Sequence, residues 1–433
     1  MIQIIGYADL AGQKAALDKI KSRSVVFDRE LLSSVAAVID DVRQRGDEAL
    51  IDYTARFDGI ELRTDQIRID SETLREYAHD ADSFVLESLR EAIRNVRAFH
   101  ERQVEKSWQY SPAPEIELGQ RITPLERVGL YVPGGTAAYP SSVVMNAVPA
   151  QVAGVKRIVV VTPPQTLAEN PAVAAALVEL NITEVYGIGG AQAIAALAFG
   201  TETVPRVDKI TGPGNQYVAA AKKLVFGAVG IDSIAGPTEV VIIADDSARG
   251  DFIAADMLAQ AEHAENASAV VLTTSEALAS EVAAELARQI QLLPRRAVIE
   301  KSLAEYGAIL VVAHLGEAVA IVNELAPEHL EITTADDEAI ARSILHAGAI
   351  FLGADTPEAV GDYFAGPNHV LPTGGSARFS SALGVYDFIK RTSVLRYSQE
   401  ELCKASAKIV ALAEAEGLQA HARSVLIRSE PKR

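Results

Sequence analysis

Residues 127–135 read RVGLYVPGG, a short run of β-branched and other apolar residues that stops at proline and glycine. The pattern returns as RIVVVTPP at 157–164, EVYGIGG at 184–190 and VDKITGPGN at 207–215. Alanine-rich helical segments separate these runs, for example PAVAAALVELN at 171–181. Strand, turn and helix in alternation predict a parallel α/β sheet.

The same alternation resumes later in the chain, with EVVIIAD at 239–245, AVVLTT at 269–274 and GAILVVA at 307–313. The sequence before residue 127 has apolar residues at helical spacing and is heavily charged, and helical spacing returns from about residue 383. We therefore expect an α/β protein with two incomplete Rossmann-like parallel-sheet domains and small helical appendages at both ends. The expected parts are an N-terminal arm at 1–25, a main α/β domain at 26–130 plus 238–382, a second Rossmann-like domain at 131–237, and a helical tail at 383–433.

Composition narrows the function classes. The 433 residues are 49% hydrophobic and 23% charged, with a formal charge of −18, which disfavours nucleic acid as a partner. The single cysteine, Cys403, excludes an intramolecular disulfide and a multi-thiolate zinc site. The N-terminus lacks an export signal and no apolar run is long enough to span a membrane. We expect a cytoplasmic enzyme or binding protein with no membrane segment.

One alanine-rich helical stretch, MLAQAEHAENA at 257–267, carries an unusual polar stripe. Helical spacing places Asp256, Gln260 and His263 on one face. Such a stripe is either a solvated surface or one wall of a site. His100, another helical histidine, lies among charged neighbours and is expected to be a solvated residue near a helix end.

Further polar residues stand at element ends and in glycine-rich segments, where a scaffold presents side chains to a cleft. Neutral imidazoles and carboxylates without thiolates suit a borderline divalent metal such as zinc. No H-E-x-x-H pair is present, and spacing alone does not show that these side chains meet. The candidates besides the helical stripe are Glu328 and His329 in NELAPEHLEI, Asp362 and His369 in GDYFAGPNHVLPTGG, and Glu416 and His421 around the helix break at Gly417.

Two glycine turns stand where a strand passes into a helix. In YGIGGAQ, Gln192 occupies the sixth position of the fingerprint G-x-G-x-x-G, so a dinucleotide site is only weakly indicated. In TGPGNQY, Asn215 can cap the following helix, whose free N–H groups could face an anion. The glycines permit a cofactor but do not require one.

Long segments of the chain together resemble the histidinol dehydrogenase family. The resemblance covers almost the whole chain, and the order of so many specific segments is stronger evidence than any single motif. It implies oxidation of L-histidinol to L-histidine through the aldehyde, with two NAD⁺ and one zinc ion per site. The segments are 129–155, 187–201, 209–222, 230–240, LAQAEH at 258–263, APEHLEI at 326–332, 361–390 and LAEAEGLQAHARSV at 412–425.

The resemblance also implies a role for each matching residue. The family often carries serine where this chain has Thr238, and the change keeps the hydroxyl. The implied zinc ligands are Gln260, His263, Asp362 and His421, and the implied acid/base pair is Glu328 and His329. The implied substrate contacts are Thr238, His369 and Glu416, together with His329 and the zinc ligands. The implied NAD contacts are Tyr131, Gln192 and Asn215. Asp256 is at most an outer partner of the zinc site, and a packing or surface role is expected.

Family members are intertwined homodimers, so the resemblance implies that the tail completes the neighbouring subunit's site. Other readings stay open from the residues alone. They are a relative that oxidises another small alcohol such as a sulfonated diol, a zinc hydrolase without NAD, a solute-binding protein with two lobes, and a thiol-dependent aldehyde dehydrogenase. The last needs an activated thiol, and Cys403 has only Lys404 beside it to lower its pKa.

Overall fold

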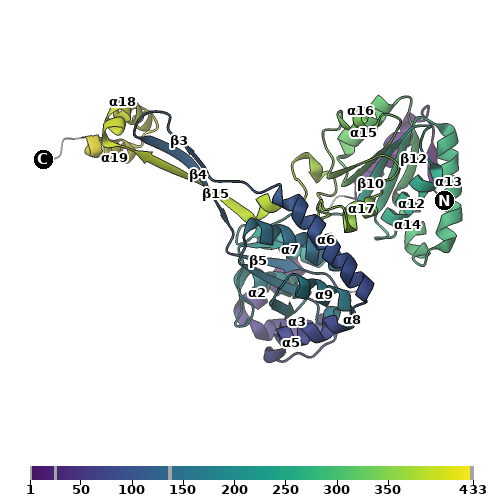
Figure 1. The fold of residues 1–433 in the computed structure, drawn as a ribbon, viewed down its shortest axis with the longest axis horizontal. Helices are drawn as coiled ribbons and strands as arrows, with labels where there is room; N and C mark the ends of the chain where they lie inside the picture. The colour runs from purple at the N-terminus through teal and green to yellow at the C-terminus, as the bar shows by residue number, and fades with distance from the viewer. Residues whose placement is uncertain (1, 24–26, 135–138, 430–433) are drawn as a thin grey trace. The chain divides into compact units, whose positions relative to one another are not determined.

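The computed structural model describes residues 2–23, 27–134 and 139–429 (Figure 1). The chain divides into two compact units. Unit 1 comprises residues 1–103 and 126–388, and unit 2 comprises residues 104–125 and 389–433. Two six-stranded sheets belong to unit 1 and one three-stranded sheet belongs to unit 2.

The first sheet of unit 1, called here the β10 sheet, is parallel throughout. Because successive side chains of a strand point to opposite faces, Val240 and Ile242 pack under three helices while Val241 and Ile243 pack under two others. The strands in order are β1 (Gln3–Ile5), β12 (Gly307–Val311), β11 (Ser268–Thr273), β10 (Glu239–Ala244), β13 (His329–Thr333) and β14 (Ala349–Leu352). One face is covered by α12 (Gly250–Ala261), α13 (Glu276–Gln289) and α14 (Arg296–Tyr306), and the other by α1 (Leu10–Lys21) and α15 (Leu315–Leu325).

Shorter elements complete this half of unit 1. They are α16 (Asp337–Ala341), α17 (Glu358–Tyr363), and the 3-10 turns η1 (Ile290–Leu292) and η2 (Ser376–Arg378). A further 3-10 turn, η3 (Val385–Phe388), packs on a helix of the second sheet. The segment between β14 and η3 contains α17 and a long irregular stretch, and it contributes several polar residues to the site described below.

The second sheet, called here the β5 sheet, is parallel except for its edge strand β2, which is antiparallel to β7. Its strands in order are β2 (Arg68–Ile69), β7 (Glu184–Gly187), β6 (Arg157–Thr162), β5 (Arg127–Tyr131), β8 (Lys209–Thr211) and β9 (Gly230–Ile231). The helices around it are α2 (Arg29–Arg45), α3 (Asp47–Asp58), α4 (Thr64–Ile67), α5 (Ser71–His79), α6 (Ser83–Glu101), α7 (Pro140–Ala153), α8 (Gln165–Glu169), α9 (Pro171–Glu179), α10 (Gly190–Phe199) and α11 (Gln216–Val225).

Unit 2 is a small antiparallel sheet with a helical hairpin. The strand β15 (Ile389–Tyr397) pairs along its whole length with β4 (Ile116–Pro124), and β4 pairs with β3 (Trp108–Tyr110). The two helices α18 (Gln399–Ala415) and α19 (Gln419–Ser429) pack on each other. Gly417 lies between them with φ of +74°, a backbone conformation that glycine adopts without strain.

The α/β class with parallel sheets is confirmed, but the packing differs from the expected grouping. The helices α2, α5 and α6 pack with helices of the β5 sheet, not with the β10 sheet. The arm at 1–25, of which residues 1, 24 and 25 lie outside the described part, places β1 at the edge of the β10 sheet. The tail at 383–433, of which 430–433 lie outside the described part, contains the strand β15 as well as helices. An amphipathic period shows that a helix has an apolar face but not which sheet that face covers.

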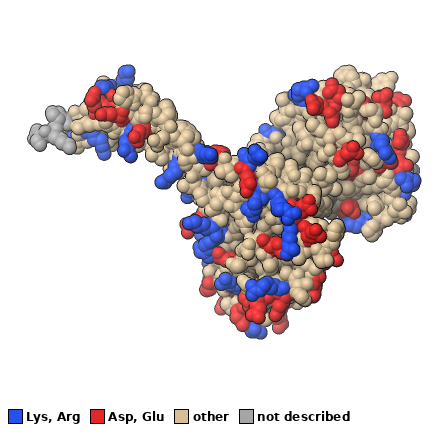
Figure 2. All heavy atoms as spheres, viewed as in Figure 1, with Lys and Arg blue, Asp and Glu red and all other residues tan. Residues whose placement is uncertain are grey.

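The surface is mixed in charge. Figure 2 shows acidic and basic side chains interspersed over the face in view, in a chain whose formal charge is −18. A net negative charge of this size repels polyanions at long range. Within the described residues, no helix is both long and apolar enough to cross a bilayer.

Candidate functional site

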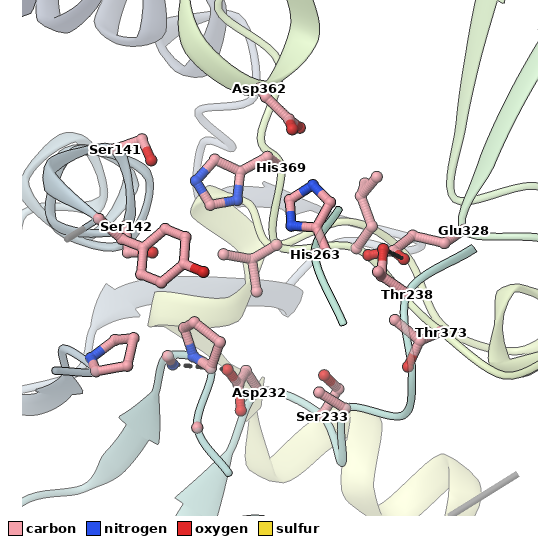
Figure 3. A pocket seen from close by; sticks show the side chains of 18 of the residues that line it. Ser141, Ser142, Asp232, Ser233, Thr238, His263, Glu328, Asp362, His369 and Thr373 are labelled. Atoms are coloured by element: carbon pink, nitrogen blue, oxygen red, sulfur yellow. Dashed lines mark hydrogen bonds between the residues drawn. The ribbon is translucent and has the colours of Figure 1, made fainter. Parts of the chain in front are cut away.

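A cavity of about 330 Å³ in unit 1 gathers most of the polar candidates (Figure 3). Thr238 directly precedes β10, Glu328 directly precedes β13, and His329 is the first residue of β13. The acid/base candidates therefore stand at the amino end of β13 and Thr238 at the amino end of the neighbouring parallel strand β10, whereas doubly wound sheets usually bind ligands at the carboxyl ends. Turns that follow strands of the β5 sheet, including Gly212, also line the cavity.

Glu328 is held at the cavity wall by two hydrogen-bond partners. One joins Thr238 Oγ1 to Glu328 Oε2, and the backbone N–H of Glu239 donates to the same oxygen at 3.1 Å. Figure 3 shows Thr238 and Glu328 meeting at one side of the cavity. Burial raises the pKa of Glu328 to about 8, because the low-dielectric surroundings disfavour the charged carboxylate. In the metal-free protein Glu328 is therefore mostly protonated at neutral pH.

His329 presents a free ring nitrogen to the site. Its Nδ1 lies 3.2 Å from the backbone carbonyl oxygen of Glu239, which fixes the proton on Nδ1 and leaves Nε2 as the acceptor. Nε2 is buried without a hydrogen-bond partner and lies 3.9 Å from Asp362 Oδ1. Burial lowers the pKa of His329 to about 3. At neutral pH the ring is therefore neutral, and Nε2 is free to accept a hydrogen bond.

A group of metal-donor side chains lies next to this pair. The donor atoms of His263, Glu358 and Asp362 all lie within 4.8 Å of one another. Burial raises the pKa of Asp362 to about 6, and burial together with neighbouring carboxyls raises the pKa of Glu358 well above its ordinary value. Crowded buried carboxyls repel each other when ionised. A divalent cation would relieve that repulsion.

Gln260, the predicted ligand on α12, is fully buried beside this group. Its side-chain amide lies 2.9 Å from Thr238 Oγ1 on one side and 3.0 and 3.2 Å from the Glu358 carboxyl oxygens on the other. Both sides are satisfied when the NH₂ group donates to Glu358 and the carbonyl oxygen accepts from Thr238. Sequence reasoning missed Glu358. The signal was its position four residues before Asp362, on the same helical face.

His369 also lines the cavity, and its Nε2 is buried without a partner. Burial lowers the pKa of His369 to about 4. The preceding residue, Asn368, anchors the segment by donating to the backbone carbonyl of Met145 at 2.6 Å. Behind it lies His100, whose Nε2 is 3.5 Å from Asn368 Nδ2. The prediction that His100 is solvated is wrong, since it is completely buried and its Nδ1 lies 2.7 Å from the Val96 carbonyl oxygen.

The three NAD candidates lie at or beyond the carboxyl ends of strands in the β5 sheet, with Gln192 on α10 after β7 and Asn215 at the start of α11 after β8. Tyr131 ends β5, and its hydroxyl accepts from the backbone N–H of Gly190 at 3.1 Å. Gln192 is buried with its side-chain oxygen unpaired. Asn215 caps α11 as predicted, accepting from the N–H groups of Tyr217 and Val218. An unpaired buried amide oxygen beside a glycine turn fits a ligand with hydroxyl or amide donors.

The last two candidates belong to unit 2. His421 lies on α19 and Glu416 is the C-terminal cap of α18, and both are exposed. Cys403 is exposed on α18. Of the predicted ligand set, unit 1 contains His263 and Asp362, which line the cavity, and Gln260, which is buried beside it.

The burial of these carboxyls predicts an unusual pH dependence of stability in the metal-free protein. Because the pKa of Glu328 rises from 4.5 to about 8 on folding, the folded state keeps a proton that the unfolded state has released. The resulting contribution to the free energy of unfolding is complete below pH 4.5 and is lost as the pH rises through about 8. The buried histidines act in the opposite direction only below their unfolded pKa of about 6.5. The free energy of unfolding should therefore fall between about pH 6.5 and 8, by up to about 1.4 kcal/mol per pH unit for this carboxyl, and level off above that range.

Urea unfolding in the presence of a chelator measures this slope. The Glu328→Gln variant, which cannot titrate at this position, should show a flatter dependence over the same range. Equal slopes in the variant and the unsubstituted protein would contradict the assignment.

Comparison with known proteins gives a consistent result. A family model described as histidinol dehydrogenase matches residues 21–429. The chain is 55% identical over 398 residues to the histidinol dehydrogenase of Geobacillus kaustophilus (strain HTA426), covering 92% of this chain and 93% of that protein. It is 54% identical over 397 residues to the one from Bacillus subtilis (strain 168), covering 92% of each. The crystal structure of histidinol dehydrogenase from Elizabethkingia anophelis matches with a TM-score of 0.92 at 35% identity, over 99% of this chain and 98% of that one.

Proposed function

The chain belongs to the histidinol dehydrogenase family and oxidises histidinol to histidine in histidine biosynthesis, and we propose that it does so with NAD as electron acceptor and one zinc ion in each site. The observation that supports a metal-assisted oxidation is the cluster of His263, Asp362 and Glu358 around one point, next to the unprotonated Nε2 of His329. Conversion of an alcohol to a carboxylate removes four electrons, so two molecules of NAD⁺ are consumed per substrate.

Zinc fits the donor set in this cavity. An imidazole, a carboxylate and an amide oxygen, from His263, Asp362 and Gln260, are ligands that zinc accepts. We assign the fourth position to His421 from the tail of a second copy of the chain. We assign Glu358 to orienting Gln260 and not to the zinc ligands. Its carboxyl group accepts from the NH₂ group of Gln260, which turns the amide oxygen away from Glu358.

NAD fits the turns of the β5 sheet. Gly190 has φ of +64° and starts α10, so the backbone there can come close to a bound group without a side chain in the way. Tyr131, Gln192 and Asn215 surround this edge of the sheet and are the proposed cofactor contacts. The incomplete glycine fingerprint is consistent with a dinucleotide held by side chains as well as by the turn.

The chain's own residues supply the proton transfers. When bound, zinc would polarise the alcohol oxygen and NAD would accept the hydride. His329 Nε2 accepts the alcohol proton, since it is unpaired and the other ring nitrogen is engaged with the backbone. For the aldehyde step, Glu328 removes a proton from the attacking water. A neighbouring cation favours the ionised form of Glu328, which the metal-free cavity disfavours.

Substrate recognition is assigned to residues around the metal ligands. Thr238 lines the cavity beside Glu328 and can hydrogen-bond a substrate group. The unpaired Nε2 of His369 faces a position suited to the imidazole or amino end of the substrate. Glu416, like His421, is assigned to the tail of the second copy, so the proposed assembly is an intertwined homodimer. A cytoplasmic location stays a prediction from the sequence.

The stoichiometry tests this proposal directly. With zinc and excess NAD⁺, complete oxidation of L-histidinol should form two NADH for each molecule consumed, measured by absorbance against the histidine produced. A sulfonated diol tested in parallel should give little NADH. Formation of one NADH per substrate, or a preference for the sulfonated diol, would contradict the proposed reaction.

A further inference from the structure

Asp256 and Glu331 are two acidic residues near the cavity that the proposed reaction does not use. Asp256 lies on α12, one turn before Gln260, and Glu331 lies on β13, two residues after His329. Since residues i and i+2 of a strand share a face, Glu331 and His329 both point to the side of the sheet that α12 covers. Glu331 is only 4% exposed, so its carboxyl group needs hydrogen-bond partners inside the protein.

Glu331 has two such partners on two different helices. Its side chain is hydrogen-bonded to the Asp256 side chain on α12. Its Oε1 accepts from the backbone N–H of Glu358 at 3.0 Å, at the start of α17. Burial raises the pKa of both Asp256 and Glu331, which keeps the proton that a hydrogen bond between two carboxyls requires. The carboxyl of Glu331 therefore bridges α12 and α17 at the level of the site.

We propose that Asp256 and Glu331 are positioning residues of the metal site. Together they hold α12, which carries Gln260 and is followed two residues after its end by His263, in register with α17, which carries Asp362. The inference rests on the proposed zinc-dependent function. A buried carboxyl pair is not in itself a strong source of stability, because an apolar pair of the same volume often serves as well or better. The presence of the pair is instead explained by the placement of the zinc ligands, since small displacements of a ligand weaken metal binding.

Zinc titration of the metal-free protein against a chromophoric chelator tests this inference. Asp256→Ala should weaken zinc binding by about 10–100-fold, the usual effect of losing a partner behind the ligands. Asp256→Asn should stay within about threefold of the unsubstituted protein, because the amide NH₂ still donates to Glu331. Glu331→Gln, which keeps an acceptor for the Glu358 N–H and donates to Asp256, should behave in the same way.

A matched control separates positioning from general destabilisation. Asp47 is also buried and accepts from the backbone N–H of Thr203, but it lies at the start of α3 around the β5 sheet. Asp47→Ala should lower the melting temperature without changing zinc affinity. The inference is overturned if Asp256→Ala binds zinc normally, if Asp256→Asn is as weak as Asp256→Ala, or if Asp47→Ala loses as much affinity. An unsubstituted protein that binds no zinc would instead refute the proposed metal centre and the inference with it.

Discussion

Replacement of Glu328 by glutamine is expected to slow aldehyde oxidation by about a thousandfold while alcohol oxidation slows far less, as expected for the loss of a general base from one step. Glutamine has nearly the same shape and can still accept from the Glu239 N–H that holds Glu328. It cannot remove a proton from water. The alcohol step relies on His329, whose Nδ1 is closer to the Glu239 carbonyl oxygen, at 3.2 Å, than to Glu328 Oε2, at 3.8 Å, so that step keeps its base.

The two half-reactions are measured separately, with L-histidinol and L-histidinaldehyde as substrates, in single-turnover experiments that follow NADH. Glu324→Gln is a matched control, because Glu324 is an exposed residue of α15 paired with Lys21 and takes no part in the site. It should leave both rates unchanged. Equal losses in the two half-reactions of Glu328→Gln would remove Glu328 from the role of water-activating base.

The second large effect is expected from His421→Ala, which should lose bound zinc and with it nearly all activity. Loss of a residue behind the ligands already costs about 10–100-fold in metal affinity, and loss of a ligand should exceed this. Elemental analysis of the purified protein measures zinc per chain. His79→Ala is the control, since His79 is exposed at the end of α5 and should keep its full zinc content. Unchanged zinc in His421→Ala would rule out the assignment.

Mixing two variants that form little histidine, with histidine formation as the measured activity, tests whether His421 acts in the neighbouring subunit. After the Glu328→Gln and His421→Ala proteins are unfolded and refolded together, each mixed dimer would contain one site with both intact residues. About a quarter of all sites would then be active in a statistical mixture of symmetric dimers. If both residues came from the same chain, every site would carry one of the two substitutions and activity would not return.

Local signals predicted some parts of the site well. The strand-to-helix turn before α11 was predicted from TGPGN, and Asn215 caps that helix, because capping depends only on residues two or three positions away. Of the polar stripe predicted from helical spacing, Asp256 and Gln260 lie on α12, whereas His263 lies two residues beyond the end of the helix. The role of Asp256 did not follow, because its partner Glu331 is 75 positions away in the sequence (331 − 256) and on another element.

The sequence by itself determined the alternation of strands and helices, the turns between them and, through long matching segments, the family. These depend on neighbouring residues or on the order of the chain. Only the tertiary structure decided that α2, α5 and α6 belong with the β5 sheet, that His100 is buried, and that Glu358 joins His263 and Asp362. The physical reason is that burial and ligand geometry are set by contacts between segments far apart in the chain, and periodicity along one segment carries no information about its partner.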